Sequence, residues 1–151
     1  MNIEQATIED AQEILALQKL AYTSEAEIYT DFNIQPLHQT LDEIKTEFAE
    51  QHFLKVSEEG RIIGSIRAYV KDGTCFIGKL IVHPEYQNRG LGTKLLQEIE
   101  NVFDNVDRYE LFTGHKSQKN LYLYEKNGYR IFRRQQVTDG LIIVFLEKYR
   151  N

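Results

Sequence analysis

Residues 80–96 read LIVHPEYQNRGLGTKLL and form the most informative stretch of the chain. An apolar strand ends at a proline, a polar turn follows, and Gly90 and Gly92 open an amphipathic helix. Glycines at these positions let backbone N–H groups converge on an anion without obstruction by side chains. The start of a helix adds partial positive charge, and Arg89 and Lys94 add full charges. The stretch therefore predicts a strand, loop and helix that bind a diphosphate group.

Two other phosphate loops do not fit this stretch. A Rossmann fingerprint needs a third glycine where Leu95 stands, and a P-loop needs Gly-Lys-Ser/Thr where Gly92 is followed by Thr93-Lys94. Taken alone, the loop leaves two interpretations. It is an anion-binding turn, or a pair of glycines that only turns a strand into a helix.

Hydrophobic periodicity and turn signals predict further elements on both sides, in the order β-α-α-β-β-β-α-β-α-β-β. Two helix starts carry capping signatures, Thr7 three residues before Asp10 and Thr40 three residues before Glu43. Hairpins and helical crossovers together predict an α/β fold, a mixed central sheet with helices on both faces. We expect strands at 3–6, 53–57, 61–70, 74–82, 109–113, 129–134 and 141–147, and helices at 8–22, 40–50, 91–103 and 117–127, with a long polar and aromatic connection at 23–39.

Composition limits the class of protein to which the chain belongs. With 151 residues it suits one domain, residues 1–151, that encloses a core. Cys75 is the only cysteine, which suits a reducing cytosol, and the N-terminal residues carry no signal-peptide pattern. No apolar stretch approaches the roughly 18 residues that a membrane-spanning helix needs. We therefore expect a cytoplasmic protein without a membrane partner.

Charge is distributed unevenly along the chain. The net charge of −5 argues against nucleic acid as a partner, because no basic face dominates. Residues 1–50 hold eleven acids and two bases, a charge of −9, whereas the remainder holds twelve acids and sixteen bases, a charge of +4. One half could attract a cation and the other an anion, or both could be solvated faces of surface helices.

Two motifs carry a resemblance to a known family. Gln87-x-x-Gly90-x-Gly92, preceded by a Val-His-Pro strand end and followed by Leu-Leu, resembles the coenzyme A signature of the GCN5-related N-acetyltransferase (GNAT) family. Residues 123–129, LYEKNGY, resemble that family's second motif, and the two occur in the family's order. The expected elements also match the acyl-CoA N-acyltransferase-like fold. The resemblance implies an enzyme that moves the acetyl group of acetyl-CoA directly to a primary amine, with no metal ion.

The resemblance also implies how the donor is bound. Backbone groups of 80–82 would hold the pantetheine arm, the amides of 88–93 would hold the pyrophosphate, and an amide near Val82 could polarise the thioester carbonyl. Many relatives place an asparagine where this chain has Ser117, so Ser117 either contacts the cofactor or only caps the helix, while Asn120 lies one turn further on. The expected cofactor-binding residues are Leu80, Ile81, Val82, Gln87, Asn88, Arg89, Gly90, Leu91, Gly92, Thr93, Lys94, Ser117 and Asn120.

The general acid of the family has a matching residue in this chain, whereas the general base does not. Tyr124 falls on the family's general-acid position, where it would protonate the departing thiolate; the alternative is a buried aromatic with no such role. The base is less defined, because the strand position that carries a glutamate in some relatives is Phe112 here. Glu110 lies two residues earlier and therefore on the same strand face. His115, His83, the acids of the first fifty residues and a water molecule are the alternatives.

The acidic first third of the chain is the expected acceptor side. Glu25, Glu27, Tyr29, Asp31 and Gln39 would bind a small polar or cationic amine, an expectation that rests on charge. A protein or peptide amine is the alternative acceptor. An alternative of another class is a coenzyme A-binding sensor or interaction module without catalysis. A homodimer formed through the closing strands is a further expectation, and Cys75 is expected to pack in the core rather than act as a nucleophile.

Overall fold

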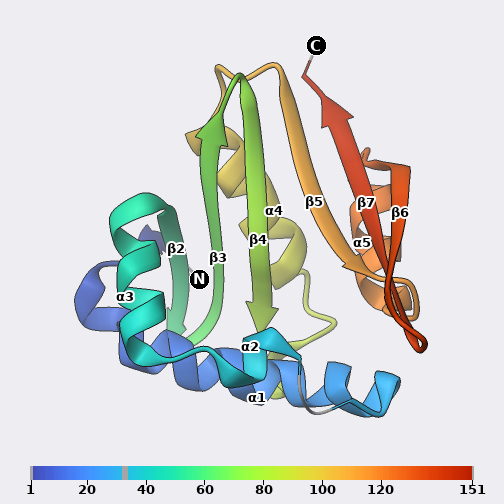
Figure 1. Cartoon of the computed structure of the whole chain (residues 1–151). Helices are drawn as coiled ribbons and strands as arrows, with labels where there is room; N and C mark the ends of the chain where they lie inside the picture. The colour runs from blue at the N-terminus through green and yellow to red at the C-terminus, as the bar shows by residue number, and fades with distance from the viewer. Residues whose placement is uncertain (1, 32–33, 151) are drawn as a thin grey trace.

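A seven-stranded sheet organises the chain in the computed structural model, which describes residues 2–31 and 34–150. The strand order is β1-β2-β3-β4-β5-β7-β6 (Figure 1). Only β4 and β5 pair in parallel, and the other neighbours are antiparallel. The strands are β1 (Ile3–Gln5), β2 (His52–Glu58), β3 (Arg61–Lys71), β4 (Thr74–Val82), β5 (Arg108–Gly114), β6 (Arg130–Thr138) and β7 (Leu141–Tyr149).

Helices cover both faces of this sheet, so the predicted mixed α/β fold is confirmed. None of the described helices has the length and apolarity to span a bilayer. The helices are α1 (Ala11–Tyr29), α2 (Gln35–His38), α3 (Leu41–Glu50), α4 (Leu91–Val102) and α5 (Gln118–Lys126), with the 3-10 turns η1 (Ile8–Asp10) and η2 (Pro84–Tyr86).

The predicted end of the first helix at residue 22 is wrong. Helix α1 continues to Tyr29, and residues 35–38 form the short α2, so the expected connection at 23–39 is largely helical; residues 32–33 lie outside the described part. Ala26 is fully buried, and Tyr29 bonds to the turn after β5. These tertiary contacts extend the helix past the polar residues that suggested its end, because packing overrides weak local propensity.

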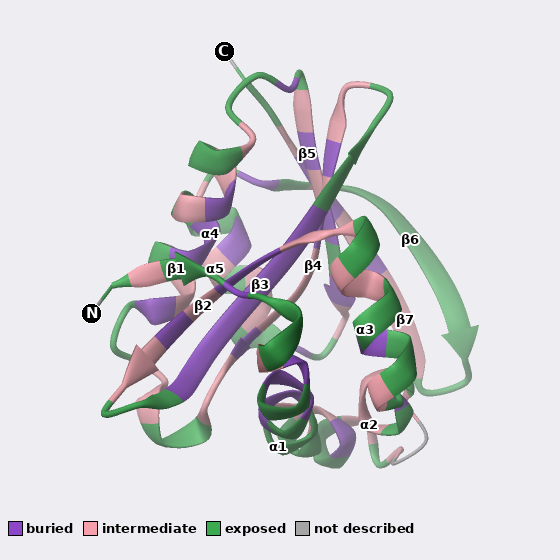
Figure 2. Cartoon of the chain, turned by 90° about the vertical axis from the view of Figure 1, so that its left-hand side faces the viewer, coloured by how far each residue is buried: buried purple, intermediate pink, exposed green. Residues whose placement is uncertain are grey.

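Two cores lie on opposite faces of the sheet. On one face, α4 buries Leu95, Leu96 and Ile99 completely. On the other face, α1 and α3 bury Ile14 and Ile44. Each such side chain contributes about 1.5–3 kcal/mol by leaving water. Figure 2 shows β3 buried along most of its length and β6 exposed at the edge.

The two capping signatures are confirmed. The amide of Glu43 donates to Thr40 Oγ1 at 3.1 Å, and the amide of Thr40 donates to Glu43 Oε1 at 2.8 Å. At the other site, the amide of Thr7 donates to Asp10 Oδ2 at 2.9 Å. These reciprocal bonds satisfy amides that the first helical turn leaves without partners.

The parallel pair β4–β5 separates soon after it begins. The strands pair only at Thr74–Arg108, Cys75–Tyr109 and Phe76–Glu110, and they diverge towards their carboxyl ends (Figure 1). The register of β4 against β3 also shifts between Ser65 and Arg67, as expected for a bulge. The bend and the missing rungs leave an open edge of β4 beside the first turn of α4.

Candidate active site

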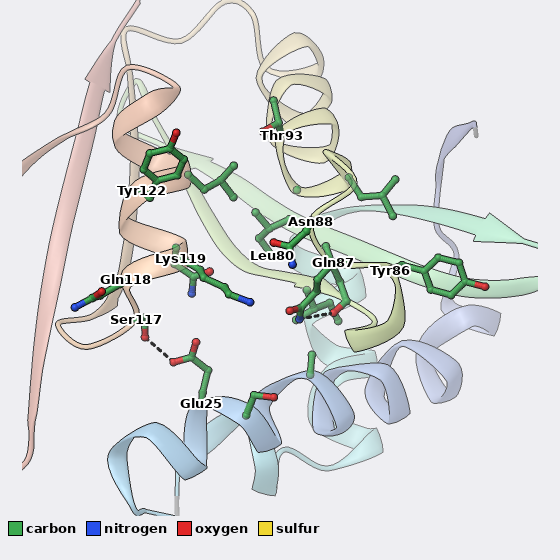
Figure 3. Close-up of a pocket in the computed structure, with 18 of the residues that line it drawn as sticks. Glu25, Leu80, Tyr86, Gln87, Asn88, Thr93, Ser117, Gln118, Lys119 and Tyr122 are labelled. Atoms are coloured by element: carbon green, nitrogen blue, oxygen red, sulfur yellow. Dashed lines mark hydrogen bonds between the residues drawn. The ribbon is translucent and has the colours of Figure 1, made fainter.

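A cavity of about 620 Å³ lies where β4 and β5 diverge (Figure 3). It is bounded by α1, by the end of β4 and its glycine loop, by the start of α4 and by α5. Its lining residues are Ala21, Tyr22, Ser24, Glu25 and Ile28, then 80–82, 86–88 and 90–93, and finally 116–120, Tyr122, Leu123 and Lys126.

The glycine loop is built as an anion-binding turn would be. Gly90 precedes α4 with φ of +81°, and a Cβ placed on it would meet no atom within 4 Å. A Cβ on Gly92 would come within 3.1 Å of Leu123 Cδ2, so glycine permits the close approach of α4 and α5. The first amides of α4 have no partners inside the helix. They are therefore available to an anion in the cavity.

All of the predicted cofactor residues except Arg89 and Lys94 line this cavity. The guanidinium of Arg89 instead lies 5.1 Å from the ring centroid of Tyr86. Lys94 lines a shallow depression beside residues 2–4 of the first strand region. Side-chain charge at the cavity is thus not supplied by the two residues from which it was expected.

Three lysines that the sequence reasoning missed supply that charge. Lys116, Lys119 and Lys126 all line the cavity from the α5 side. The only feature of the sequence that pointed to them was the net charge of +4 after residue 50, and that charge did not identify individual lysines. Their ammonium groups make this side of the cavity suitable for phosphates.

Ser117 does not cap α5 with its side chain, so the capping interpretation is wrong. Its hydroxyl donates to Glu25 Oε2 at 2.5 Å (Figure 3). Because a hydroxyl has one proton, the Tyr29 hydroxyl, 2.8 Å away, donates to Ser117 Oγ. The amide of Lys116 in turn donates to the Tyr29 hydroxyl at 2.9 Å. This chain of donors, which ends on Glu25, fastens α1 to the turn between β5 and α5.

Gly114 makes that fastening sterically possible. A Cβ on Gly114 would collide with the hydroxyl and ring of Tyr29. The Tyr29 ring also lies 5.9 Å from the ring of His115, centroid to centroid. The turn after β5 therefore needs glycine where α1 docks.

Two tyrosines lie near Glu25 at the inner side of the cavity. Tyr22 lines it, and burial raises the pKa of Tyr22 to about 12. Tyr124 is only 6% exposed and is not among the lining residues. Burial, followed by Tyr22 and Glu25, raises the pKa of the Tyr124 hydroxyl above its ordinary range. Both hydroxyls therefore stay protonated at neutral pH and can donate.

The bases expected outside the acidic segment do not reach the cavity. Glu110 forms an ion pair with Arg108 Nη1 at 2.9 Å. His83 accepts from the amide of Glu85 at 3.1 Å, and His115 accepts from the amide of Ile142 at 3.0 Å. None of these side chains lines the cavity. Glu110 as the base stays a prediction, and Glu25 is the carboxylate that the fold brings to the site.

The other residues expected to bind the acceptor lie at separate places in the structure. Glu27 is exposed, and the amide of Asp31 donates to the Ala26 carbonyl. Gln39 is 4% exposed and bonds to Gln18 at 2.8 Å, so the structure does not bring it to the cavity. Cys75 lies in the core with no exposed surface, as expected.

Comparison with known proteins shows the family to which the chain is similar. The family model described as "Acetyltransferase (GNAT) family" matches residues 12–129. The UPF0157 protein YqkA of Bacillus subtilis (strain 168) is 27% identical over 146 residues, which are 97% of this chain and 41% of YqkA. The chain thus spans less than half the length of that relative.

Other relatives match over most of their length. The S-(2-succino)cysteine N-acetyltransferase of Bacillus subtilis (strain 168) is 28% identical over 150 residues, with 92% of this chain and 90% of that protein covered. The crystal structure of the PaiA N-acetyltransferase from Thermoplasma acidophilum, in complex with coenzyme A, superposes with a TM-score of 0.78. It is 18% identical and covers 99% of this chain and 100% of its own, so the likeness is one of fold.

Proposed function

The chain belongs to the acetyltransferase (GNAT) family, and on that premise we propose that it transfers the acetyl group of acetyl-CoA directly to the primary amine of a small polar or cationic molecule. The observation that carries the proposal is the cavity at the β4–β5 divergence. It joins an open strand edge, a glycine turn at a helix start, and one carboxylate, Glu25.

The donor half of the proposal rests on backbone groups. Backbone of 80–82 on the open edge of β4 would hydrogen-bond the pantetheine arm as an added strand does. The amides of 88–93 would hold the pyrophosphate. Lys116, Lys119 and Lys126 would neutralise the phosphates from the opposite side of the cavity.

The acetyl transfer needs three coupled proton movements. The amine nitrogen attacks the thioester carbonyl carbon, a C–N bond forms, and the C–S bond breaks. An amide near Val82 would stabilise the negative charge that develops on the carbonyl oxygen. An acceptor that binds as an ammonium ion loses its first proton before attack, and we assign that proton to Glu25 directly or through a water molecule. We assign protonation of the departing thiolate to the Tyr124 hydroxyl, which is protonated at neutral pH, and the second proton lost by the attacking nitrogen restores that hydroxyl.

The acceptor half of the proposal has two supports. Glu25 is a carboxylate that lines the cavity and is held in place by Ser117, so it suits the ammonium group of an amine. The similar protein from Bacillus subtilis is named for acetylation of a small cysteine derivative, S-(2-succino)cysteine. The name of that relative favours a small molecule over a protein as the acceptor, whereas Glu25 suits an amine of either kind.

Release of free thiol from acetyl-CoA tests the proposal. The full chain is assayed with small amines, free amino acids and peptides, and products are identified by mass spectrometry. We expect thiol release and N-acetylation with small amines or amino acids. Glu25→Gln should raise the acceptor KM or lower kcat by at least about 10-fold. The matched Glu27→Gln should do neither, because Glu27 is exposed and does not line the cavity.

Other outcomes separate the alternatives. Thiol release with peptides alone would overturn the small-molecule acceptor. Tight binding of coenzyme A without thiol release for any amine would overturn catalysis and favour a sensor.

A further inference from the structure

The cavity has two ends with different side chains. Glu25 and Ser117, which share a hydrogen bond, lie at one end (Figure 3). Tyr122 and Thr93 lie at the other end, and Asn88 of the glycine turn lies between the two. In the proposed reaction the thioester must come close to Glu25. The adenosine end of coenzyme A must therefore extend towards Tyr122.

Helix α5 presents three side chains to the cavity at helical spacing. Lys119, Leu123 and Lys126 all line it, and spacings of four and three residues place them on one face of the helix. Leu123 Cδ2 lies 3.1 Å from the position of a Cβ on Gly92, so Leu123 marks the level of the first turn of α4. Lys126 lies one helical turn, about 4.5 Å along the axis, beyond that level and away from Ser117.

The Lys126 ammonium group lies beside an aromatic ring rather than beside an acid. Its Nζ is 5.8 Å from the ring centroid of Tyr122, which lines the cavity and is 68% exposed. Within residues 2–31 and 34–150, Lys126 forms no ion pair with a carboxylate. An exposed contact between a cation and a ring contributes little, about 0.5–1 kcal/mol. The positive charge is therefore available to an anion that enters the cavity.

Coenzyme A carries an anion at the corresponding place along its length. Its parts follow in the order thioester, pantetheine, pyrophosphate and adenosine 3′-phosphate. The cavity presents, in the same order, Glu25, the open edge of β4, the turn into α4, and Lys126. A phosphomonoester carries a charge of about −1.5 to −2 at neutral pH, so it is the strongest partner that the cofactor offers to an ammonium group.

We propose that Lys126, beside the ring of Tyr122, binds the 3′-phosphate of the donor, so that the chain selects acetyl-CoA over acyl carriers that lack this phosphate. The assignment rests on the proposed acetyl transfer and defines the donor specificity of the same site. The competing explanation is that Lys126 is a solvated lysine that only adds diffuse positive charge near the pyrophosphate.

Calorimetric titration with coenzyme A and with 3′-dephospho-coenzyme A decides between the two, because these ligands differ only in the 3′-phosphate. We expect the wild-type chain to bind coenzyme A about 10-fold more tightly. Lys126→Met should weaken binding of coenzyme A about 10-fold and leave binding of the dephospho form unchanged. Lys126→Arg should retain most of the preference. The preference should also decrease at high salt, because an exposed ion pair is screened.

Two further lysines serve as controls. Lys119→Met removes a cation one turn to the other side of Leu123, and it should weaken binding of both ligands alike. Lys45→Met changes an exposed lysine of α3 that does not line the cavity, and it should leave both affinities unchanged.

The outcomes separate this assignment from the proposed function. Equal affinity of the wild-type chain for the two ligands, or binding of neither, would overturn the 3′-phosphate site. Equal weakening of both ligands by Lys126→Met, or weakening of neither, would also overturn it. Selective binding of coenzyme A without thiol release for any amine would refute the acetyl transfer and leave the 3′-phosphate site in place. Thiol release with the same KM for acetyl-CoA and its dephospho form would do the reverse.

Discussion

Tyr124 is the side chain to which we assign proton donation. Burial keeps its hydroxyl protonated, and its ring lies 6.2 Å from that of Tyr129, centroid to centroid, on the core side of α5. Substitution to phenylalanine keeps the ring and removes only the proton donor.

We expect Tyr124→Phe to lower kcat about 100-fold and to leave the affinity for coenzyme A unchanged. Steady-state kinetics and calorimetry measure the two quantities. Tyr149→Phe is the control, because Tyr149 is 56% exposed and does not line the cavity. A Tyr124→Phe enzyme with wild-type kcat would show that the thiolate leaves without this acid.

At the scale of elements, we expect the turn into α4 to determine donor binding. Gly90 and Gly60 both have positive φ, +81° and +77°, and both have open space where a Cβ would lie. Alanine at either position should therefore cost a similar strain, about 1–2 kcal/mol of unfolding free energy.

Only one of these two substitutions should weaken the binding of acetyl-CoA. We expect Gly90→Ala to raise the KM for acetyl-CoA about 10-fold, because it displaces amides that would hold the pyrophosphate. Gly60→Ala, in the β2–β3 turn, should leave that KM unchanged. Equal KM values in the two variants would contradict the role of the α4 turn.

The attachment of α1 to the β5–α5 turn should determine acceptor binding. Gly114→Ala should push Tyr29 away and release Ser117 and Glu25. We expect the acceptor KM to rise about 10-fold or more while coenzyme A affinity changes little. Gly140→Ala is the control, since a Cβ there meets no atom within 4 Å. An unchanged acceptor KM in Gly114→Ala would separate this attachment from the acceptor site.

The elements that depend on local signals were predictable from sequence. The hairpin turns, the capping boxes and the glycine that precedes α4 all act within a few residues, so the sheet and the turn into α4 followed from them. The end of α1 and the hydrogen-bond partner of Ser117 could not be predicted from local signals. The Ser117–Glu25 bond joins residues 92 positions apart, and no local pattern encodes such a contact. The bulge at Lys79 likewise reflects the register of β3 against β4.

At the scale of the whole molecule, α1 bridges a sheet that is open at one end. The β4 and β5 strands meet at Phe76–Glu110 and diverge below it, and α1 crosses beneath this opening (Figure 1). The acidic and basic halves of the sequence thereby face one cavity, with Glu25 on one side and three lysines on another.

Alkaline stability should reflect the two tyrosines with raised pKa values beside this cavity. Tyr22 and Tyr124 have raised pKa values in the fold, so above about pH 10 the unfolded chain has released protons that the folded chain still holds. The free energy of unfolding should therefore fall as pH rises through about 10 to 12. Urea unfolding followed by circular dichroism measures this slope.

Removal of both hydroxyls should flatten that slope. In the Tyr22→Phe/Tyr124→Phe variant the free energy of unfolding should fall less steeply with pH, whereas Tyr149→Phe should behave as the wild-type chain does. A slope that is the same in all three proteins would show that neither Tyr22 nor Tyr124 retains its proton in the folded chain.

Coenzyme A should occupy the cavity at the β4–β5 divergence. A two-dimensional ¹⁵N NMR titration of the full chain with coenzyme A measures this, because each backbone amide reports its own surroundings. We predict the largest shifts at the amides of 80–82 and 88–93, with smaller ones at 116–120. Shifts confined to the exposed strand β6, or no shifts at millimolar coenzyme A, would contradict the claim.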